Sequence, residues 1–294
     1  MDRKLIRPRS IEEALREREK YGRDALPIAG GQSLLVLLRN KLIDPKFLLD
    51  LQTLEALQGV TSRDDGLSIG AMTTIHTLAL SAAIQTAAPV LAQGASKVGS
   101  TAIRNMGTIG GNLCHNEPGA DLPPALLTLN AVAELRSSKG SRKIPLREFF
   151  HNYFETVVTP EELVCSIEVP VLPRGASGVY LKHAISSEDL AIAGVAVVLV
   201  PDEKRSGVVR EARIALGGVA PVPLRAIRAE GVVNGARLND EAIREAGEVA
   251  ASEAEPMSDP HGSAEYRTKM VKVLVRRAIT AAMAPWERNG NGKA

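Results

Sequence analysis

The chain has 294 residues, of which 45% are hydrophobic and 24% charged. Those proportions are ordinary for a folded globular protein and exclude a chain that is disordered throughout. The 36 basic and 34 acidic residues leave a net charge of +2, and aromatic residues make up only 3%. A nucleic-acid-binding surface or a base-stacking platform is therefore not expected.

The sequence also limits where the protein works and which cofactors it holds by itself. No apolar run approaches the roughly 20 residues of a membrane-spanning helix, and the charged start MDRKLIRPRS lacks the apolar core of a signal peptide. We therefore expect a cytoplasmic protein. Two cysteines, Cys114 and Cys165, are fewer than the four thiolates of an iron–sulfur cluster, so any such cluster is expected in a partner.

The first part of the chain predicts short strands and helices in alternation. Ser10 is a good N-cap with Glu13 three residues later, which predicts a helix from Ser10 to Tyr21. Ser33 is expected to begin a second helix. Strands are expected at residues 4–7, 26–29, 47–50 and 67–70.

Residues 73–98 are mostly helical in pattern, with Pro89 marking a break or a new first turn. The next segment, GSTAIRNMGTIGGN at 99–112, has no sustained period, so we expect a long functional loop. Asp121 then precedes a helix, LPPALLTLN, with two prolines in its first turn.

The second half of the chain predicts another α+β unit. A composition shift at residues 171–178, VLPRGASG, suggests a domain boundary. We therefore expect one domain over residues 1–175, with two α+β subdomains split near 55–60, and a second domain over 176–294. Strands are expected at 131–136, 163–169, 179–184, 192–200 and 209–216. Helices are expected at 225–234, at 240–251 and from Ser263 to Pro285.

Residues 29–33, AGGQS, lie between a predicted strand and a predicted helix. Consecutive glycines leave backbone N–H groups uncovered, and a helix N-terminus adds its positive end, so this segment suits a diphosphate. The alternative is an ordinary chain reversal, because glycine is the default turn residue. The segment is not GxGxxG, which disfavours nicotinamide binding in the Rossmann manner.

A second glycine pair occurs in TIGGN at 108–112, where Thr108 and Asn112 add a hydroxyl and an amide. Two such segments are more informative than one, because a dinucleotide has two phosphates and needs several donors. Asp121 is suited to accept hydrogen bonds from ribose hydroxyls. Helix capping is an equally good interpretation, since Asp121 stands directly before LPPALL.

Three further charged or titratable residues, His115, Glu117 and Lys182, are candidates for a chemical role. His115 and Glu117 follow the second glycine pair, but together with Cys114 they fall short of a metal-ligand set, so no metal site is expected. Lys182 stands in an apolar run, VYLKHA. It is interpreted either as a charge that protects an edge strand or as a cation facing a diphosphate or a reduced flavin.

Taken together, these residues resemble the FAD-binding medium subunit of molybdenum hydroxylases, the group that includes carbon monoxide dehydrogenase and xanthine dehydrogenase. The resemblance covers nearly the whole chain. The segments that carry it are AGGQSLL (29–35), GAMTT (70–74), IRNMGTIGGN (103–112), PGADLPPALL (118–127), SIEVP (166–170), VYLKHA (179–184), ARIALGGVAPVPLRA (212–226) and SDPHGSAEYR (258–267).

The resemblance implies an α+β protein. A vanillyl-alcohol-oxidase (PCMH)-type FAD-binding domain would precede a smaller domain with a three-stranded antiparallel sheet and helices. Asp121 would hold the adenosine side of FAD, Val164 would lie near the isoalloxazine, and Lys182 would lie near its oxygens. Val98 would take a flavin-facing position that is aromatic in some relatives. The diphosphate and ribityl chain would be surrounded by Ile28, Ala29, Gly30, Gly31, Gln32, Ser33, Leu34, Thr108, Ile109, Gly110, Gly111 and Asn112.

The same resemblance implies a complex. A small partner subunit would carry 2Fe–2S clusters, and a large one would carry molybdopterin, in a dimer of heterotrimers. FAD in this chain would accept electrons from the clusters and pass them to a quinone, a nicotinamide or another acceptor, with no catalytic residue in this chain. One departure is that Ile185-Ser186-Ser187 stands where relatives often have an arginine.

Two other classes of function remain open from the sequence. One is a self-sufficient FAD-dependent oxidoreductase of the same superfamily, which needs an acid or base over the flavin. The other is an assembly protein that kept the scaffold and lost the cofactor, against which the intact AGGQS and TIGGN segments argue.

Overall fold

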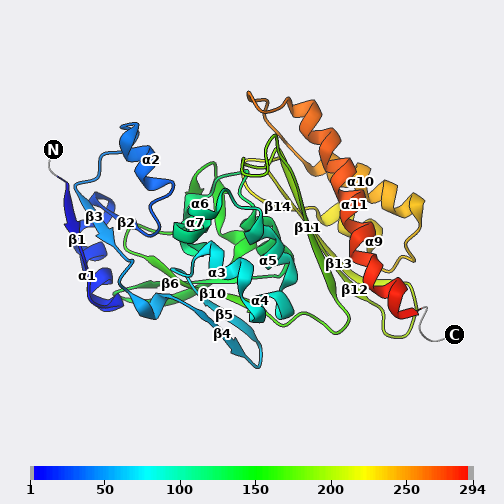
Figure 1. The fold of residues 1–294 in the computed structure, drawn as a ribbon, viewed down its shortest axis with the longest axis horizontal. Coiled ribbons are helices and arrows are strands. Elements are labelled where there is room, and N and C mark those ends of the chain that lie inside the picture. The colour runs from blue at the N-terminus through cyan, green and yellow to red at the C-terminus, as the bar shows by residue number, and fades with distance from the viewer. Residues whose placement is uncertain (1–2, 291–294) are drawn as a thin grey trace.

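The computed structural model describes residues 3–290, and the chain forms three parts arranged side by side (Figure 1). The N-terminal part is a parallel three-stranded sheet in the order β1-β3-β2. Ser10 caps its first helix, because the Ser10 hydroxyl accepts a hydrogen bond from the Glu13 N–H. The elements are β1 (Lys4–Ile6), α1 (Ile11–Tyr21), the 3-10 turn η1 (Gly22–Asp24), β2 (Ala25–Ile28), α2 (Leu34–Arg39) and β3 (Phe47–Asp50).

The middle part is a five-stranded antiparallel sheet in the order β4-β5-β10-β6-β7, with helices packed on one side of it (Figure 1). Its core includes the fully buried Leu91, Ile109, Leu126 and Phe149. The strands and turns are η2 (Glu55–Leu57), β4 (Val60–Arg63), β5 (Gly66–Gly70), β6 (Val132–Ser137), β7 (Gly140–Pro145), η3 (Leu146–Glu148), β8 (Phe150–Asn152), β9 (Glu155–Thr156) and β10 (Leu163–Pro170). The helices are α3 (Ile75–Leu80), α4 (Ala82–Ala87), α5 (Pro89–Ser96), α6 (Thr101–Met106), α7 (Ile109–His115) and α8 (Leu122–Thr128).

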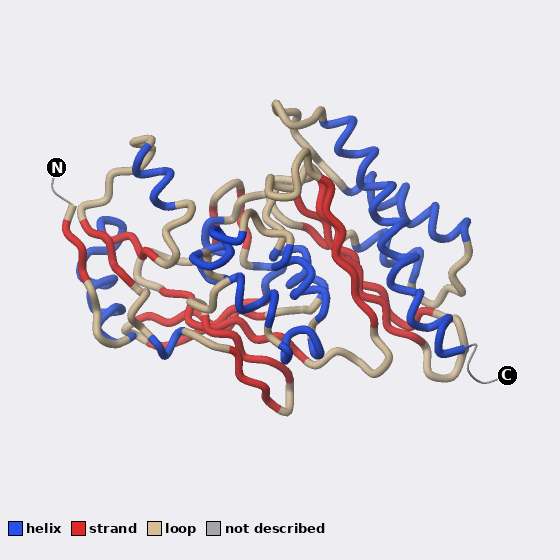
Figure 2. The backbone as a smooth tube through the Cα atoms, viewed as in Figure 1, coloured by secondary structure: helices blue, strands red, loops and turns tan. Residues whose placement is uncertain are grey.

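The C-terminal part is an antiparallel sheet that lies between two layers of helices (Figure 2). Helices α9 and α11 pack on one face, and α5 and α8 of the middle part contact the other. Strand β12 is buried along all but its last residue, which explains its unbroken apolar sequence AGVAVVLV. The elements are β11 (Ser177–His183), β12 (Ala193–Pro201), β13 (Val209–Gly217), β14 (Leu224–Arg225), α9 (Ile227–Val233), α10 (Asp240–Glu253) and α11 (Ala264–Gly290).

The α+β class is confirmed, but three local predictions were wrong. Residues 99–112 form two helices, α6 and α7, capped by Ser100 and Thr108. Each helix is too short to show a helical period in the sequence. The C-terminal sheet has a fourth, two-residue strand, β14. Helix α11 continues past Pro285, and its next residue Trp286 donates from Nε1 to the Gly175 carbonyl at 3.0 Å.

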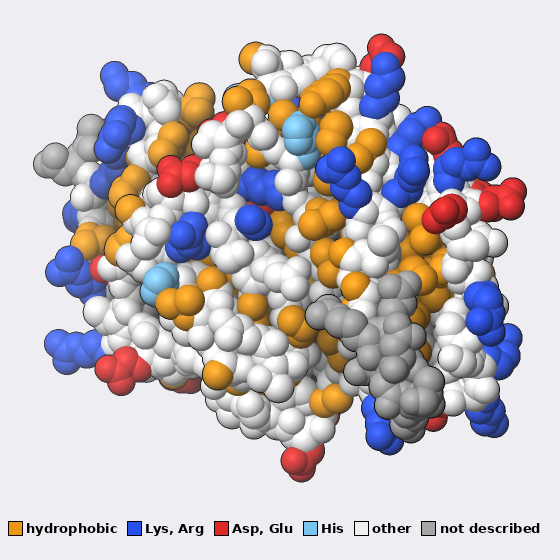
Figure 3. Space-filling model, turned by 45° about the vertical axis from the view of Figure 1, so that its right-hand side comes forward, with side chains coloured by type: hydrophobic (Ala, Val, Ile, Leu, Met, Phe, Trp, Pro, Cys, Tyr) orange, Lys and Arg blue, Asp and Glu red, His pale blue; other side chains and the backbone are white. Residues whose placement is uncertain are grey.

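The molecular surface mixes apolar and charged side chains. In the view of Figure 3, hydrophobic side chains lie across the middle of the face, and Lys and Arg are frequent toward its two sides. Among the described residues, no helix combines the length and the apolar character that crossing a bilayer requires.

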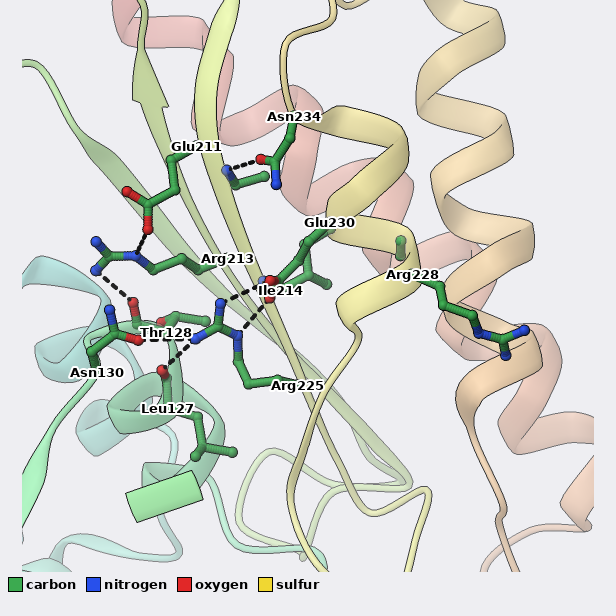
Figure 4. A network of polar contacts seen from close by, with 12 residues as sticks. Leu127, Thr128, Asn130, Glu211, Arg213, Ile214, Arg225, Arg228, Glu230 and Asn234 are labelled. Carbon is green, nitrogen blue, oxygen red and sulfur yellow. Dashed lines mark hydrogen bonds and ion pairs between the residues drawn. The ribbon is translucent and has the colours of Figure 1, made fainter. Parts of the chain in front are cut away.

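A buried polar network joins the C-terminal sheet to the middle part (Figure 4). Glu230 of α9 accepts from the Ile214 N–H at 2.8 Å and from both Nε and Nη2 of Arg225. Arg225 also donates across the domain junction, to the Leu127 carbonyl at 3.2 Å and to Asn130 Oδ1 at 3.0 Å. Glu230 thus holds the arginine that bridges the two parts.

Glu230→Gln is expected to lower the free energy of unfolding by about 3 kcal/mol, because it leaves the guanidinium of Arg225 without its counter-charge in a buried site. Urea denaturation followed by circular dichroism measures the change. Glu265→Gln is the matched control, since Glu265 pairs with Lys269 in the open and should change stability by less than about 0.5 kcal/mol. Equal losses in the two variants would contradict a bridging role for Glu230.

Candidate functional site

A cleft of about 600 Å³ lies where the three parts of the chain meet. This volume is in the range of cofactor and small-molecule sites, which cover roughly 300–1,000 Å³. The loop before α2, the start of α7, strand β10 and residues 188–190 of the C-terminal part all line it. Four segments far apart in the sequence therefore form one site.

The segment 29–33 is an open cradle of backbone donors. The N–H groups of Gly30, Gly31, Gln32 and Ser33 donate to no acceptor among residues 3–290. Gly31 has φ +72°, a left-handed conformation that favours glycine. A Cβ on Gly30 would overlap the carbonyl oxygen of Met106, so only glycine fits there. Successive free N–H groups beside a left-handed glycine form an anion-binding nest.

The second glycine segment, residues 108–112, has a different structural role. The Ile109 N–H donates to the Thr73 carbonyl at 3.0 Å and the Gly110 N–H to the Ala71 carbonyl at 2.8 Å. The Gly111 N–H donates to Thr108 Oγ1 at 3.1 Å. The backbone N–H groups in the first turn of α7 therefore already have acceptors within the protein. The expectation that this segment repeats the donor cradle of residues 29–33 was wrong.

Gly110 and Gly111 instead allow α7 to pack closely. A Cβ on Gly110 would lie 2.7 Å from the Ala71 Cβ and 2.8 Å from the Ala71 carbonyl oxygen. A Cβ on Gly111 would lie 2.9 Å from Thr108 Oγ1 and 3.6 Å from the Ala29 Cβ. Gly110 thus lets α7 pack closely against the backbone that follows β5, and Gly111 leaves the wall of the cleft without a side chain at that point.

Asn112 provides a polar group without a partner. Its Oδ1 is buried and accepts no hydrogen bond from the described residues, although Asn112 lines the cleft. Buried polar atoms are nearly always hydrogen-bonded, and an exception calls for an explanation such as a missing ligand. Asn112 is therefore a polar group of the cleft whose acceptor oxygen is available to a bound group.

Asp121 and Lys182 form one buried unit. Asp121 Oδ2 lies 2.9 Å from Lys182 Nζ, and Oδ1 accepts from the Tyr180 hydroxyl at 2.7 Å. The two charged side chains are only 3% and 5% exposed. Burial raises the pKa of Asp121 to about 6, although the neighbouring Lys182 opposes the shift. Asp121 occupies the N-cap position of α8 but makes no capping bond, so its carboxylate serves the contact with β11.

The contact between Asp121 and Lys182 changes the expected positions of these residues along the cofactor. The resemblance implies that Asp121 serves the adenosine side and Lys182 the isoalloxazine, yet their charged atoms are in contact. They can only serve the same end of an extended dinucleotide. Val98 belongs to this end too, because Lys182 Nζ also donates to the carbonyl of Lys97 at 2.8 Å.

The other predicted residues divide clearly. Of all the residues predicted to bind the cofactor, only Ile28, Ile109 and Lys182 do not line the cleft. Ile28 ends β2 directly before the nest, whereas Ile109 is fully buried in the core of the middle part and faces away from the cleft. Val164 is nearly buried on β10, beside Glu162 and Leu163, which also line the cleft.

Several cleft residues were not predicted as cofactor contacts. Arg18 of α1 lines the cleft as a buried cation that donates only to the backbone carbonyls of Ala25, Gly22 and Thr159. Nothing in its sequence context distinguished it from the solvated charges of EEALREREK. Cys114, His115 and Glu117 also line the cleft. Residues 3–290 contain no group of three or more His, Cys, Asp or Glu side chains arranged for a metal ion.

Gly110→Val is expected to prevent folding, with or without a cofactor, because the new side chain meets the backbone of Ala71. The loss is estimated at about 3 kcal/mol or more, the upper range for overpacking. Soluble yield and thermal melting of the flavin-free protein measure it. Gly231→Val is the control, since no atom lies within 4 Å of a Cβ there. A stable Gly110→Val protein would contradict this packing role.

The comparisons with known proteins agree with this architecture. Residues 1–172 match the model of the FAD binding domain in molybdopterin dehydrogenase, and residues 179–282 match the CO dehydrogenase flavoprotein C-terminal domain. These matches define a two-domain flavoprotein. The chain belongs to the family of FAD-binding medium subunits of molybdenum hydroxylases, and it is thus a subunit of an oxidoreductase.

Individual relatives are similar over nearly their whole length. The chain is 36% identical to the glyceraldehyde dehydrogenase medium chain of Sulfolobus acidocaldarius, over 93% of this chain and 96% of that protein. It is 37% identical to the carbon monoxide dehydrogenase medium chain of Afipia carboxidovorans, over 95% and 96%. Among solved structures, the Cu,Mo-CO dehydrogenase in its cyanide-inactivated form superposes with a TM-score of 0.92 at 36% identity, covering 96% of this chain and 98% of that one. Quinoline 2-oxidoreductase from Pseudomonas putida 86 gives 0.91 at 30% identity, covering 97% and 98%.

Proposed function

We propose that this chain binds FAD in the cleft and relays electrons, accepting them from the iron–sulfur clusters of a small partner subunit and passing them to an external acceptor. The observation that carries the proposal is the run of four unpartnered N–H groups at Gly30–Ser33, which faces a cleft large enough for a dinucleotide. Residues 1–175 form the FAD-binding domain in this proposal, and residues 176–294 form the C-terminal domain.

The polar groups of the cleft suit FAD. The nest at residues 30–33 donates to the diphosphate, whose two negative charges need several donors. Asn112 Oδ1 accepts from a hydroxyl of the ribityl chain, which gives the buried oxygen its missing partner. Thr108, Gly110 and Gly111 shape the wall against which the cofactor lies.

The direction in which FAD lies follows from the different side chains at the two ends of the cleft. We place the isoalloxazine at the end formed by Val98, Asp121 and Lys182, because a fixed cation stabilises an electron-rich ring. The adenosine then lies toward Arg18 and Val164. This reverses the sequence-based positions of Asp121 and Val164. The bound FAD supplies the redox chemistry, and the residues of this chain hold and orient it.

The proposed complex contains a small iron–sulfur subunit and a large molybdopterin subunit, as a dimer of heterotrimers in the cytoplasm. Exposed apolar side chains beside the cleft support contact with such partners. They include Leu35 and Val36 on α2 and Ile103 and Met106 on α6. The substrate would be chosen by the large subunit.

The visible spectrum of the purified full-length chain, incubated with FAD and desalted, tests the proposal. Bound flavin bands are expected, together with co-purification of molybdenum and iron when the chain is isolated from its native host with its partners. Absence of flavin bands after incubation would overturn FAD binding. Turnover of a small substrate by the chain alone would favour the self-sufficient oxidoreductase instead.

Asn112→Leu should have opposite effects on the free and the bound protein. Removing a buried oxygen without a partner should stabilise the flavin-free chain by about 1 kcal/mol, while the dissociation constant for FAD should rise about tenfold as one hydrogen bond is lost. Urea denaturation and fluorescence titration with FAD measure the two effects. Unchanged FAD affinity would contradict the proposed position of the cofactor.

A further inference from the structure

Arg18 is a buried cation on the wall of the cleft. Helix α1 turns Ile11, Ala14 and Leu15 toward the core, and Arg18 lies on the same buried face one turn later, with only 5% of its surface exposed. The Arg18 side chain nevertheless lines the cleft, as Pro27 of β2 does. A buried charge needs compensating interactions, because it loses its hydration when it leaves water.

The protein supplies only part of that compensation. Arg18 Nη1 donates to the carbonyls of Ala25 at 2.5 Å and Gly22 at 3.3 Å, and Nη2 donates to the Thr159 carbonyl at 3.4 Å. The Nε–H group of Arg18 is buried and has no acceptor in the described part of the chain. Since buried polar groups are nearly always hydrogen-bonded, this donor on the wall of the cleft is available to an acceptor on a bound molecule.

No acidic side chain among residues 3–290 forms an ion pair with Arg18. The carboxylate of Glu162, which also lines the cleft, contacts Arg142 at 2.6 Å and 2.9 Å and accepts from the Thr159 N–H at 2.9 Å. Burial lowers the pKa of Arg18, and the exposed Glu161 opposes this shift only in part. A guanidinium stays protonated in proteins, so Arg18 remains a charged donor.

The surroundings of Arg18 suit a flat ring of low polarity. Val158, Leu163 and Val164 line the cleft, and Val158 directly precedes Thr159, whose carbonyl Arg18 contacts. Cys114 also lines it and adds a thiol that is uncharged at neutral pH. Adenine has flat faces and ring nitrogens that accept hydrogen bonds at its edge. Its shape and chemistry therefore match apolar walls with one free donor.

We propose that Arg18 recognises the adenine of FAD and makes the cleft selective for this dinucleotide over the mononucleotide FMN. The Nε–H group donates to a ring nitrogen of adenine, while the carbonyls of Gly22, Ala25 and Thr159 hold the guanidinium in place. This rests on the proposed binding and direction of FAD. FMN ends at its phosphate, so it reaches the nest at residues 30–33 and leaves Nε without an acceptor.

The dissociation constants of FAD and FMN, measured by fluorescence titration of the full-length flavin-free chain at about pH 8, test the inference. At that pH the terminal phosphate of FMN carries two negative charges, as the diphosphate of FAD does. Long-range attraction to a cation therefore acts on both flavins and cancels in the ratio of the two constants. Arg18→Leu should raise the dissociation constant of FAD about tenfold, as expected for one hydrogen bond to a charged group, and leave that of FMN nearly unchanged.

Two further variants separate recognition of adenine from stability of the fold. Arg18→Lys keeps the charge but has a single nitrogen, which the backbone carbonyls occupy. It should therefore recover stability lost in Arg18→Leu without recovering the preference for FAD. Arg16→Leu makes the same change on the exposed face of α1 and should leave both dissociation constants as in the wild type. Thermal melting of each flavin-free variant measures its stability.

The outcomes separate this inference from the proposal on which it rests. Equal weakening of FAD and FMN in Arg18→Leu, or no weakening of FAD, would overturn recognition of adenine by Arg18. A wild-type preference for FAD in Arg18→Lys would overturn it too, and this variant decides alone where Arg18→Leu does not fold. Failure of the wild-type chain to bind either flavin would instead overturn the proposed function.

Discussion

The buried contact between Asp121 and Lys182 is the constraint on which the site depends. One charge comes from the start of α8 in the middle part and the other from β11 in the C-terminal sheet. An isolated charge in such a place costs several kcal/mol, so each residue makes the other tolerable. The Tyr180 hydroxyl completes the arrangement, and burial keeps the pKa of that phenol well above its usual value, so it remains a donor. The cleft therefore has a rigid end that both domains build together.

The two glycine segments show how similar patterns serve different physical purposes. Gly30 and Gly31 leave donors free, whereas the donors at 109–111 are consumed by Thr73, Ala71 and Thr108. Close packing against Ala71 accounts for the glycine at position 110, and no close approach of a phosphate is needed to explain it. A glycine pair in a sequence indicates that backbone must come close to something, and only the surrounding fold tells whether that is a ligand or another strand.

Much of the architecture could be predicted from the sequence. The capping Ser10, the apolar run of β12 and the strand before Gly30 each carry a local signal, and their elements formed as expected. Helices α6 and α7 did not, because six or seven residues cannot display a period. Arg18, Glu188 and Asp189 reach the cleft through tertiary contacts that no local pattern encodes. The domain boundary at residue 175 and the individual cofactor contacts remain predictions.

The two-sided burial of β12 has a consequence for how the protein is made. Its sheet receives α5 and α8 on one face, and Asp121, which lines the cleft, directly precedes α8. During synthesis Asp121 leaves the ribosome before Lys182, so a nascent chain that has only completed its first domain holds a carboxylate without its counter-charge and a helical layer without its cover. The cofactor pocket is closed at this end only after the C-terminal strands have been translated. Completion of the pocket at this end thus depends on β11, which follows the N-terminal and middle parts in the chain.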